Sequence, residues 1–132
     1  MDRLFVDTGA WFAFFVRSDP DHERVARTLE RCQGRLVSSE YVFDELVTLL
    51  RNRVSHRDAV TVGEALRGGE VASLVSVGPR DVQGAWRIFS SQSDKRYSFT
   101  DCTSFALMRR LGLDTAVAVD GHFRQAGFVV LP

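Results

Sequence analysis

The sequence predicts an α/β protein with three layers, in which helices cover both faces of a short, mostly parallel central sheet. Short apolar runs alternate with longer segments whose apolar residues recur at helical spacing, which is the pattern of βαβ units. Residues that favour helix starts and stops separate these segments. With 132 residues, of which 45% are hydrophobic, the chain can bury a sizeable core, and we expect one domain over residues 1–132.

The expected strands are short and apolar. The first leads directly into Asp7, with the small residues Thr8, Gly9 and Ala10 after it, so the chain should turn sharply there. The fourth leads in the same way into Asp120. The five strands are expected over residues 4–6, 35–38, 72–77, 115–119 and 128–131.

The expected helices follow from capping signals and apolar spacing. Residues 10–16 are apolar on all sides, which requires burial on most of the surface. Asp19 and Pro20 resemble a cap followed by a first-turn proline, and Ser55 with Asp58 resembles a capping box. Helices are therefore expected over residues 10–16, 20–32, 40–53, 56–68, 79–91 and 100–111.

Two acidic residues stand where parallel strands end. Asp7 follows the first strand and Asp120 follows the fourth. The carboxyl ends of parallel strands lie along one edge of the sheet, where ligands bind in open α/β folds. The alternative is that each aspartate caps the turn after its strand, a common role for this residue.

Two further acids lie on helices. Glu45 borders the apolar arc of its helix, in a row with Tyr41, whereas Asp44 points to solvent. Asp101 shares a row with apolar residues that belong in the core. The alternatives are a solvated rim for Glu45 and, for Asp101, a capping box with Ser98.

Four converging carboxylates would repel one another and raise one another's pKa. A divalent cation removes that repulsion, and oxygen-only ligands select Mg²⁺ or Mn²⁺. Such an ion can polarise a phosphodiester and generate a hydroxide, which is the chemistry of nucleases and phosphatases.

Four short motifs in register resemble the PIN domain family, most closely its VapC-like ribonuclease toxins. They are Phe5-Val6-Asp7-Thr8, Phe43-Asp44-Glu45-Leu46, Phe99-Thr100-Asp101-Cys102 and Val119-Asp120-Gly121-His122-Phe123.

The resemblance implies a metal-dependent endoribonuclease whose acidic cluster is Asp7, Glu45, Asp101 and Asp120, with Asp120 matching the family least well. Thr8 and Thr100 would supply hydroxyls that support the metal site or touch phosphate. The resemblance also implies an RNA substrate, a homodimer and a small antitoxin partner. The apolar segment 11–16 is expected to contribute to a groove for an amphipathic partner helix.

Three other functions remain open at this point. Asp7-Thr8-Gly9-Ala10 also matches the motif of retropepsin-like aspartic proteases, which use two aspartates and no metal. Their fold is almost entirely β, unlike the pattern here. A non-catalytic α/β binding module with capping acids is the second alternative, and a metal-dependent phosphatase is the third.

Overall composition gives little guidance to a partner. Seventeen basic residues balance seventeen acidic ones, so any cationic surface must be local. Cys32 and Cys102 match no metal or disulfide framework, and no apolar run is long enough to span a membrane, so we expect a cytoplasmic protein. The scattered histidines, including His122 beside Asp120, are expected to have surface or capping roles.

Overall fold

A computed structural model describes residues 2–132 and confirms the predicted three-layer α/β/α class. All neighbouring strands pair in parallel, in the order β3-β2-β1-β4-β5. The strands are β1 Leu4–Val6, β2 Leu36–Ser39, β3 Ser73–Val75, β4 Thr115–Val117 and β5 Val129–Leu131. In the central strand, Phe5 pairs with Val37 on one side and with Ala116 on the other.

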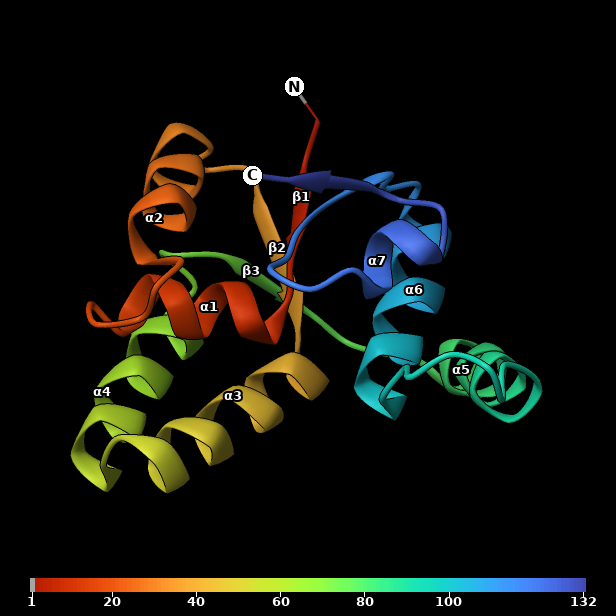
Figure 1. Cartoon of the computed structure of the whole chain (residues 1–132), viewed down its shortest axis with the longest axis horizontal. Coiled ribbons are helices and arrows are strands. Elements are labelled where there is room, and N and C mark those ends of the chain that lie inside the picture. Colours follow the sequence, from red (N-terminus) through yellow and green to blue (C-terminus); the bar gives the residue numbers. More distant parts are fainter. Residues whose placement is uncertain (1) are drawn as a thin grey trace.

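The helices divide between the two faces of the sheet (Figure 1). The first four lie on one side of the strands: α1 Thr8–Phe15, α2 His22–Arg31, α3 Glu40–Arg53 and α4 His56–Arg67. The last three lie on the other: α5 Pro79–Ser91, α6 Phe99–Leu111 and α7 His122–Gln125. The strand order reverses direction after β3, so right-handed crossovers require this division. Within residues 2–132, no helix is both long enough and apolar enough to cross a membrane.

The centre of the core ties the first helix to two strands. The Trp11 side chain, which is fully buried, donates from Nε1 to Ser38 Oγ at 3.2 Å. Ser38 Oγ in turn donates to the carbonyl oxygen of Val6 at 2.9 Å. This relay satisfies buried polar groups that burial would otherwise leave costly, and it fixes α1 against the carboxyl end of β1.

Several predicted boundaries are wrong. The helix expected from Pro20 begins at His22, because Asp19 Oδ1 accepts from the backbone N–H of Asp21 and forms a local turn instead of a cap. The fourth strand ends at Val117 rather than Val119, since the chain then turns into the unpredicted helix α7. The third strand also keeps only residues 73–75 of the expected 72–77.

The cap predicted at Ser55 is correct, and two further helix ends have caps of a familiar kind. Ser39 Oγ accepts from Val42 N at the start of α3, and Ser55 Oγ accepts from Asp58 N at the start of α4. Gly112 ends α6 with φ of 69°, a left-handed conformation that glycine adopts at no steric cost.

A buried ion pair fastens α5 to α6. Asp81 is almost completely buried, and its carboxylate accepts from Arg110 Nε at 3.0 Å and from Gly78 N at 2.9 Å. Arg110 also donates to the carbonyl oxygen of Ser76 at 3.0 Å. The hydrogen bond from the Arg110 guanidinium, together with the Gly78 N–H, holds the pKa of Asp81 below its usual range despite burial.

Removing the cation of this pair should destabilise the fold. We expect Arg110→Ala to lower the free energy of unfolding at pH 7 by about 1–2 kcal/mol, because a buried carboxylate loses its partner while the arginine itself is half exposed. The pKa of Asp81 is lowered in the folded state, so the pair stabilises the protein above the unfolded pKa of about 3.9. The difference between wild type and variant should shrink as the pH falls below that value.

Urea unfolding of both proteins at pH 7 and pH 3 measures this effect. Arg27→Ala is a matched control, since Arg27 is exposed on α2 and makes no ion pair with any residue in 2–132. Equal losses for the two variants would show that the pair contributes nothing specific.

Candidate functional site

Asp7 occupies the carboxyl end of β1, as the sequence predicts. It stands at the N-cap position of α1, yet its side chain makes no capping hydrogen bond. Asp7 is 3% exposed, and its buried Oδ1 has no hydrogen-bond partner. The hydroxyl of the next residue, Thr8, is equally buried and equally without a partner. A turn-capping role for the Asp7 carboxylate is therefore excluded.

Burial raises the pKa of Asp7 well above its usual value, and three other carboxylates add to the rise. They belong to Asp101, Asp120 and Glu45, with Asp101 acting most strongly. The backbone N–H of Thr8 opposes the rise, although its geometry falls short of a hydrogen bond. The four acids predicted from the sequence thus lie close enough at one edge of the sheet for the other three to raise the pKa of Asp7.

Asp101 combines a structural role with its place in this group. It forms a reciprocal capping box with Ser98, in which Ser98 Oγ accepts from Asp101 N and Asp101 Oδ2 accepts from Ser98 N. The same Oδ2 lies 2.8 Å from Nδ1 of His122. Burial raises the pKa of Asp101, while Ser98 and His122 limit the rise. The capping role considered from the sequence and the placement near Asp7 are both correct.

Asp120 lies closer to solvent than the prediction of a strand end implied. Its side chain is 43% exposed, and Oδ1 accepts from His122 N at 3.0 Å, which starts α7. Gly9 allows this segment to approach α1, because a Cβ at Gly9 would meet Val119 Cγ2 at 2.7 Å. Asp120 is thereby carried to the same edge as Asp7, three residues beyond the end of β4.

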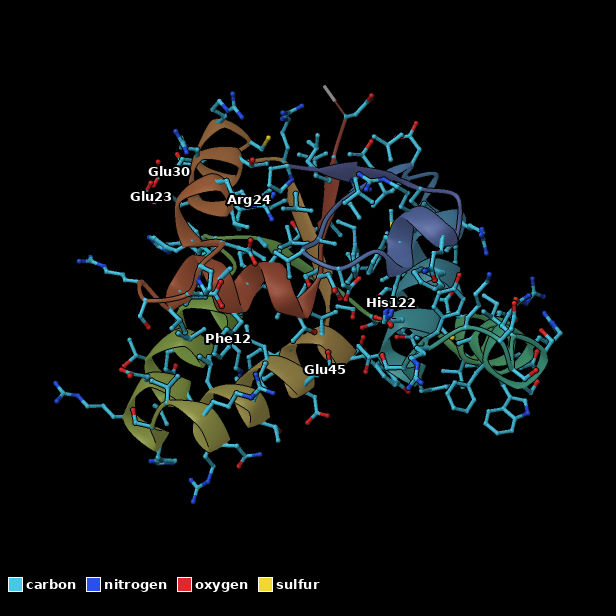
Figure 2. The ribbon with its side chains drawn as sticks, viewed as in Figure 1. Phe12, Glu23, Arg24, Glu30, Glu45 and His122 are labelled. Atoms are coloured by element: carbon cyan, nitrogen blue, oxygen red, sulfur yellow. The ribbon has the colours of Figure 1, made fainter. Side chains whose placement is uncertain are left out.

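Glu45 reaches the same region from α3. It is half buried, whereas Asp44 is exposed, as the helical periodicity predicts. In Figure 2, Glu45 and His122 both lie near the end of β1, Glu45 on α3 and His122 on α7. Thr100 lies in the first turn of α6, where its carbonyl oxygen accepts from Thr103 and Ser104.

The residue that sequence reasoning missed is His122. It was expected to have a surface or capping role, but it is half buried and joins two of the acids, contacting Asp101 at 2.8 Å and lying 3.7 Å from Asp120 Oδ2. An ionised carboxylate only accepts hydrogen bonds, so Nδ1 carries the proton when Asp101 is charged. Its position two residues after Asp120 was the available signal, and the unpredicted helix α7 is what turns the ring inward.

The carboxylate and hydroxyl oxygens of these residues are the ligands that a hard divalent cation prefers. Among the described residues, however, they are not already arranged around one point, since no three His, Cys, Asp or Glu side chains are placed to hold a metal ion together. Asp101 and Asp120 bond instead to His122 and to the backbone N–H groups of Ser98 and His122. The free oxygens of Asp7 and Thr8 are the groups that a cation and its ligated water would satisfy.

Comparison with known proteins establishes the family. The model of the PIN domain matches residues 4–129. The chain belongs to the PIN domain family. Two relatives come from Mycobacterium tuberculosis. The 23S rRNA-specific endonuclease VapC20 is 36% identical over 126 residues, which cover 96% of this chain and 95% of that one. Ribonuclease VapC26 is 31% identical over 136 residues, which cover 98% of this chain and 100% of that one.

Solved structures agree with this assignment. The crystal structure of VapC20, a Sarcin-Ricin loop cleaving toxin, superposes with a TM-score of 0.92 at 36% identity, covering 98% of this chain and 99% of that one. A DNA-bound VapBC from Salmonella typhimurium gives a TM-score of 0.75 over 98% and 97% of the chains at 13% identity, which shows a shared fold. The prediction of a VapC-like PIN ribonuclease is confirmed.

The burial of Asp7 has a consequence for stability that does not depend on any substrate. Since its pKa is raised, the folded protein holds this proton to higher pH than the unfolded chain does. Stability is then lost as the pH rises from about 3.9 through the folded pKa. We expect metal-free Asp7→Asn to unfold at the same temperature as metal-free wild type or higher at pH 7.5, with a gain on the order of 1 kcal/mol.

The advantage of this variant should disappear near pH 3, where both folded and unfolded Asp7 are protonated. Thermal unfolding in EDTA at both pH values measures it, with Asp44→Asn as the control for loss of an exposed charge on α3. A lower melting temperature for Asp7→Asn at pH 7.5 would contradict a destabilising buried charge.

Proposed function

We propose that this chain is a Mg²⁺- or Mn²⁺-dependent endoribonuclease that acts as the toxin of a toxin–antitoxin pair. The observation that carries the metal site is the Asp7 carboxylate, which is buried, without a partner at Oδ1, and raised in pKa by three other acids. Asp7, Glu45, Asp101 and Asp120 would hold the metal. When bound, the metal supplies a polarised phosphodiester and a water that ionises readily.

The residues of the chain divide the remaining work. Asp7 is held between a buried strand and the buried residues Ala10 and Trp11 of α1, so it would fix the position of the cation. Glu45 and Asp120 are partly exposed and can rotate toward it. His122 holds Asp101 in place and stands between Asp101 and Asp120. Thr8 would place its hydroxyl on a metal-bound water or on the scissile phosphate, and Thr100 is proposed for the same role.

The substrate and partners follow from the relatives. Because VapC20 is named for 23S rRNA, a structured loop of ribosomal RNA is the first substrate to test. An antitoxin is proposed because VapC20, which is similar to this chain, is described as a Sarcin-Ricin loop cleaving toxin, and VapC-like toxins pair with a small antitoxin. The half-buried Phe14 and Phe15 of the apolar segment border a hollow of about 510 Å³ between α1 and α2, which would accept side chains of a partner helix. A homodimer is proposed from the family alone.

The alternatives considered from the sequence are less well supported. The fold excludes a retropepsin-like protease, whose nearly all-β architecture differs from this parallel sheet with seven helices in residues 2–132. A non-catalytic module with capping acids conflicts with Asp7, which caps nothing. A phosphatase would share the metal chemistry, but the relatives are ribonucleases by name.

Cleavage of RNA tests the site directly. Wild-type protein with Mg²⁺ or Mn²⁺ should cut 23S rRNA fragments, and EDTA should stop the reaction. Asp7→Asn and Glu45→Gln should each lower the rate by about 100-fold or more, because each removes a charge that the metal needs. Asp44→Asn should keep most of the activity, since Asp44 points to solvent on the same helix. Equal losses for Glu45→Gln and Asp44→Asn would rule out the proposed site.

Metal binding can also be measured without RNA. Mg²⁺ should raise the melting temperature of wild type as its concentration rises, since it binds the folded state preferentially. The shift should be much smaller for Asp7→Asn, whereas Asp44→Asn should behave as wild type. Absence of a Mg²⁺ or Mn²⁺ shift in wild type at millimolar concentrations would argue that the acids serve the fold alone.

A further inference from the structure

One histidine contacts two of the four acids through two different donors. The ring Nδ1 of His122 lies 2.8 Å from Asp101 Oδ2, and the backbone N–H of the same residue donates to Asp120 Oδ1 at 3.0 Å. The second oxygen of Asp120, Oδ2, lies 3.7 Å from the ring nitrogen, which is too far for a hydrogen bond. His122 therefore bonds to one oxygen of each carboxylate.

The Asp101 carboxylate is bonded through only one of its oxygens. Oδ2 accepts from Ser98 N at 3.0 Å as well as from the His122 ring. A carboxylate oxygen has two lone-pair sites, so these two donors fill the sites of Oδ2. Within residues 2–132, Asp101 Oδ1 accepts no hydrogen bond, as is also true of Asp7 Oδ1. Oδ1 is consequently the oxygen of Asp101 whose lone pairs are free for a cation.

Neither helix start needs the bond from the His122 ring. The capping box of α6 is complete without it, because Ser98 and Asp101 each donate a backbone N–H to the side chain of the other. At the start of α7, the donor to Asp120 is the backbone of His122 and not its ring. The ring is 27% exposed, so water would satisfy Nδ1 if the ring turned outward. Helix capping therefore does not explain why the ring points inward.

Aromatic packing holds the ring in this position. The rings of Tyr97 and His122 meet edge to face, with centroids 5.8 Å apart at 78°. Tyr97 packs in turn against Phe105, with centroids 5.0 Å apart. The residue after His122, Phe123, is completely buried and also packs against Phe105, at 4.9 Å. The donor is thus placed by the core that joins α6 and α7, before any contact with Asp101 is considered.

We propose that His122 is a positioning residue that determines which oxygens of two acids bind the metal. Its ring occupies Asp101 Oδ2 and leaves Oδ1 for the cation, while its backbone N–H occupies Asp120 Oδ1 and leaves Oδ2. Hydrogen bonds that orient ligating side chains in this way typically contribute about 10- to 100-fold to metal affinity. The inference rests on the proposed metal-dependent function, to which it adds a residue outside the four acids.

Substitution of the ring tests its donor separately from the backbone donor. The three variants keep the N–H of residue 122 and hence the bond to Asp120. His122→Phe keeps a ring beside Tyr97 but removes the donor, and we expect it to weaken Mn²⁺ binding by about 10- to 100-fold. His122→Asn should recover most of this loss, because its amide nitrogen takes the place of Nδ1. His122→Gln should not, because its amide lies one carbon farther from the backbone.

The probe is Mn²⁺ alone, without RNA, and electron paramagnetic resonance measures the concentration of free Mn²⁺. His56→Phe is the matched control, because His56 is exposed at the start of α4 and bonds to none of the acids. It should bind Mn²⁺ as wild type does. Melting curves without metal confirm that each variant is folded.

Nuclear magnetic resonance of wild type labelled with ¹⁵N-histidine gives a second measurement that depends on no variant. The Nδ1–H signal of His122, assigned through its contact with Tyr97, should persist when Mg²⁺ is added, because the cation takes Oδ1 and leaves Oδ2 bonded to the ring. His22 on α2 is an internal reference. Its Nδ1 lies 2.8 Å from the carbonyl oxygen of Ala13, which only accepts, so its Nδ1–H signal should not change.

Three results would overturn this role of His122. Equal Mn²⁺ affinity in His122→Phe and wild type would show that the ring donor does not matter. A loss that His122→Asn fails to recover would assign the ring another role, such as ligation through Nε2. Disappearance of the His122 Nδ1–H signal on addition of Mg²⁺ would show that Oδ2 leaves the ring for the cation. Failure of the proposed metal site would appear differently, because wild type itself would then bind no Mn²⁺ at millimolar concentrations.

Discussion

A carboxylate buried without a partner is the constraint around which this molecule is arranged. The Asp7 side chain follows a completely buried strand, and no backbone or side-chain donor satisfies its Oδ1. A charge buried without a partner costs much more folding free energy than a solvated aspartate in a surface turn. The neighbouring acids increase that cost instead of relieving it. The arrangement is explained if a cation binds at the site. Each carboxylate would then be attracted to the cation, and this attraction would outweigh the repulsion among the carboxylates.

The sequence predicted the fold class because periodicity and capping act locally. The Ser55 and Ser98 caps form as expected, and the alternation of strands and helices predicts the parallel sheet. The errors occur where a local side-chain bond competes with the expected element. Asp19 forms a turn with Asp21, which delays α2. Asp120 accepts from His122 N and starts a four-residue helix too short to show any periodicity.

The site was predictable to the extent that its residues lie on regular elements. Strand ends located Asp7, and the helical periodicity distinguished Glu45 from Asp44, whose exposures differ as expected. His122 was not predictable in this way, because its contact with Asp101 joins residues 21 positions apart in the chain. The contacts among the rings of Tyr41, Trp86, Phe89 and Phe99 were not predictable for the same reason, since these residues come from three helices and meet only in the folded molecule.

Asp101 shows why loss of activity alone is weak evidence in a site of this kind. One oxygen, Oδ2, completes the capping box with Ser98 and also meets His122. Replacing Asp101 therefore removes a helix cap, releases a histidine and deletes a charge in a single step, and its effects on folding and on catalysis cannot be separated. Asp7 makes no capping bond, so its replacement by asparagine removes charge without removing a structural hydrogen bond at Oδ1. Replacement of Asp7 is consequently the clearest test of the chemistry of the site, because this side chain makes fewer structural hydrogen bonds than that of Asp101.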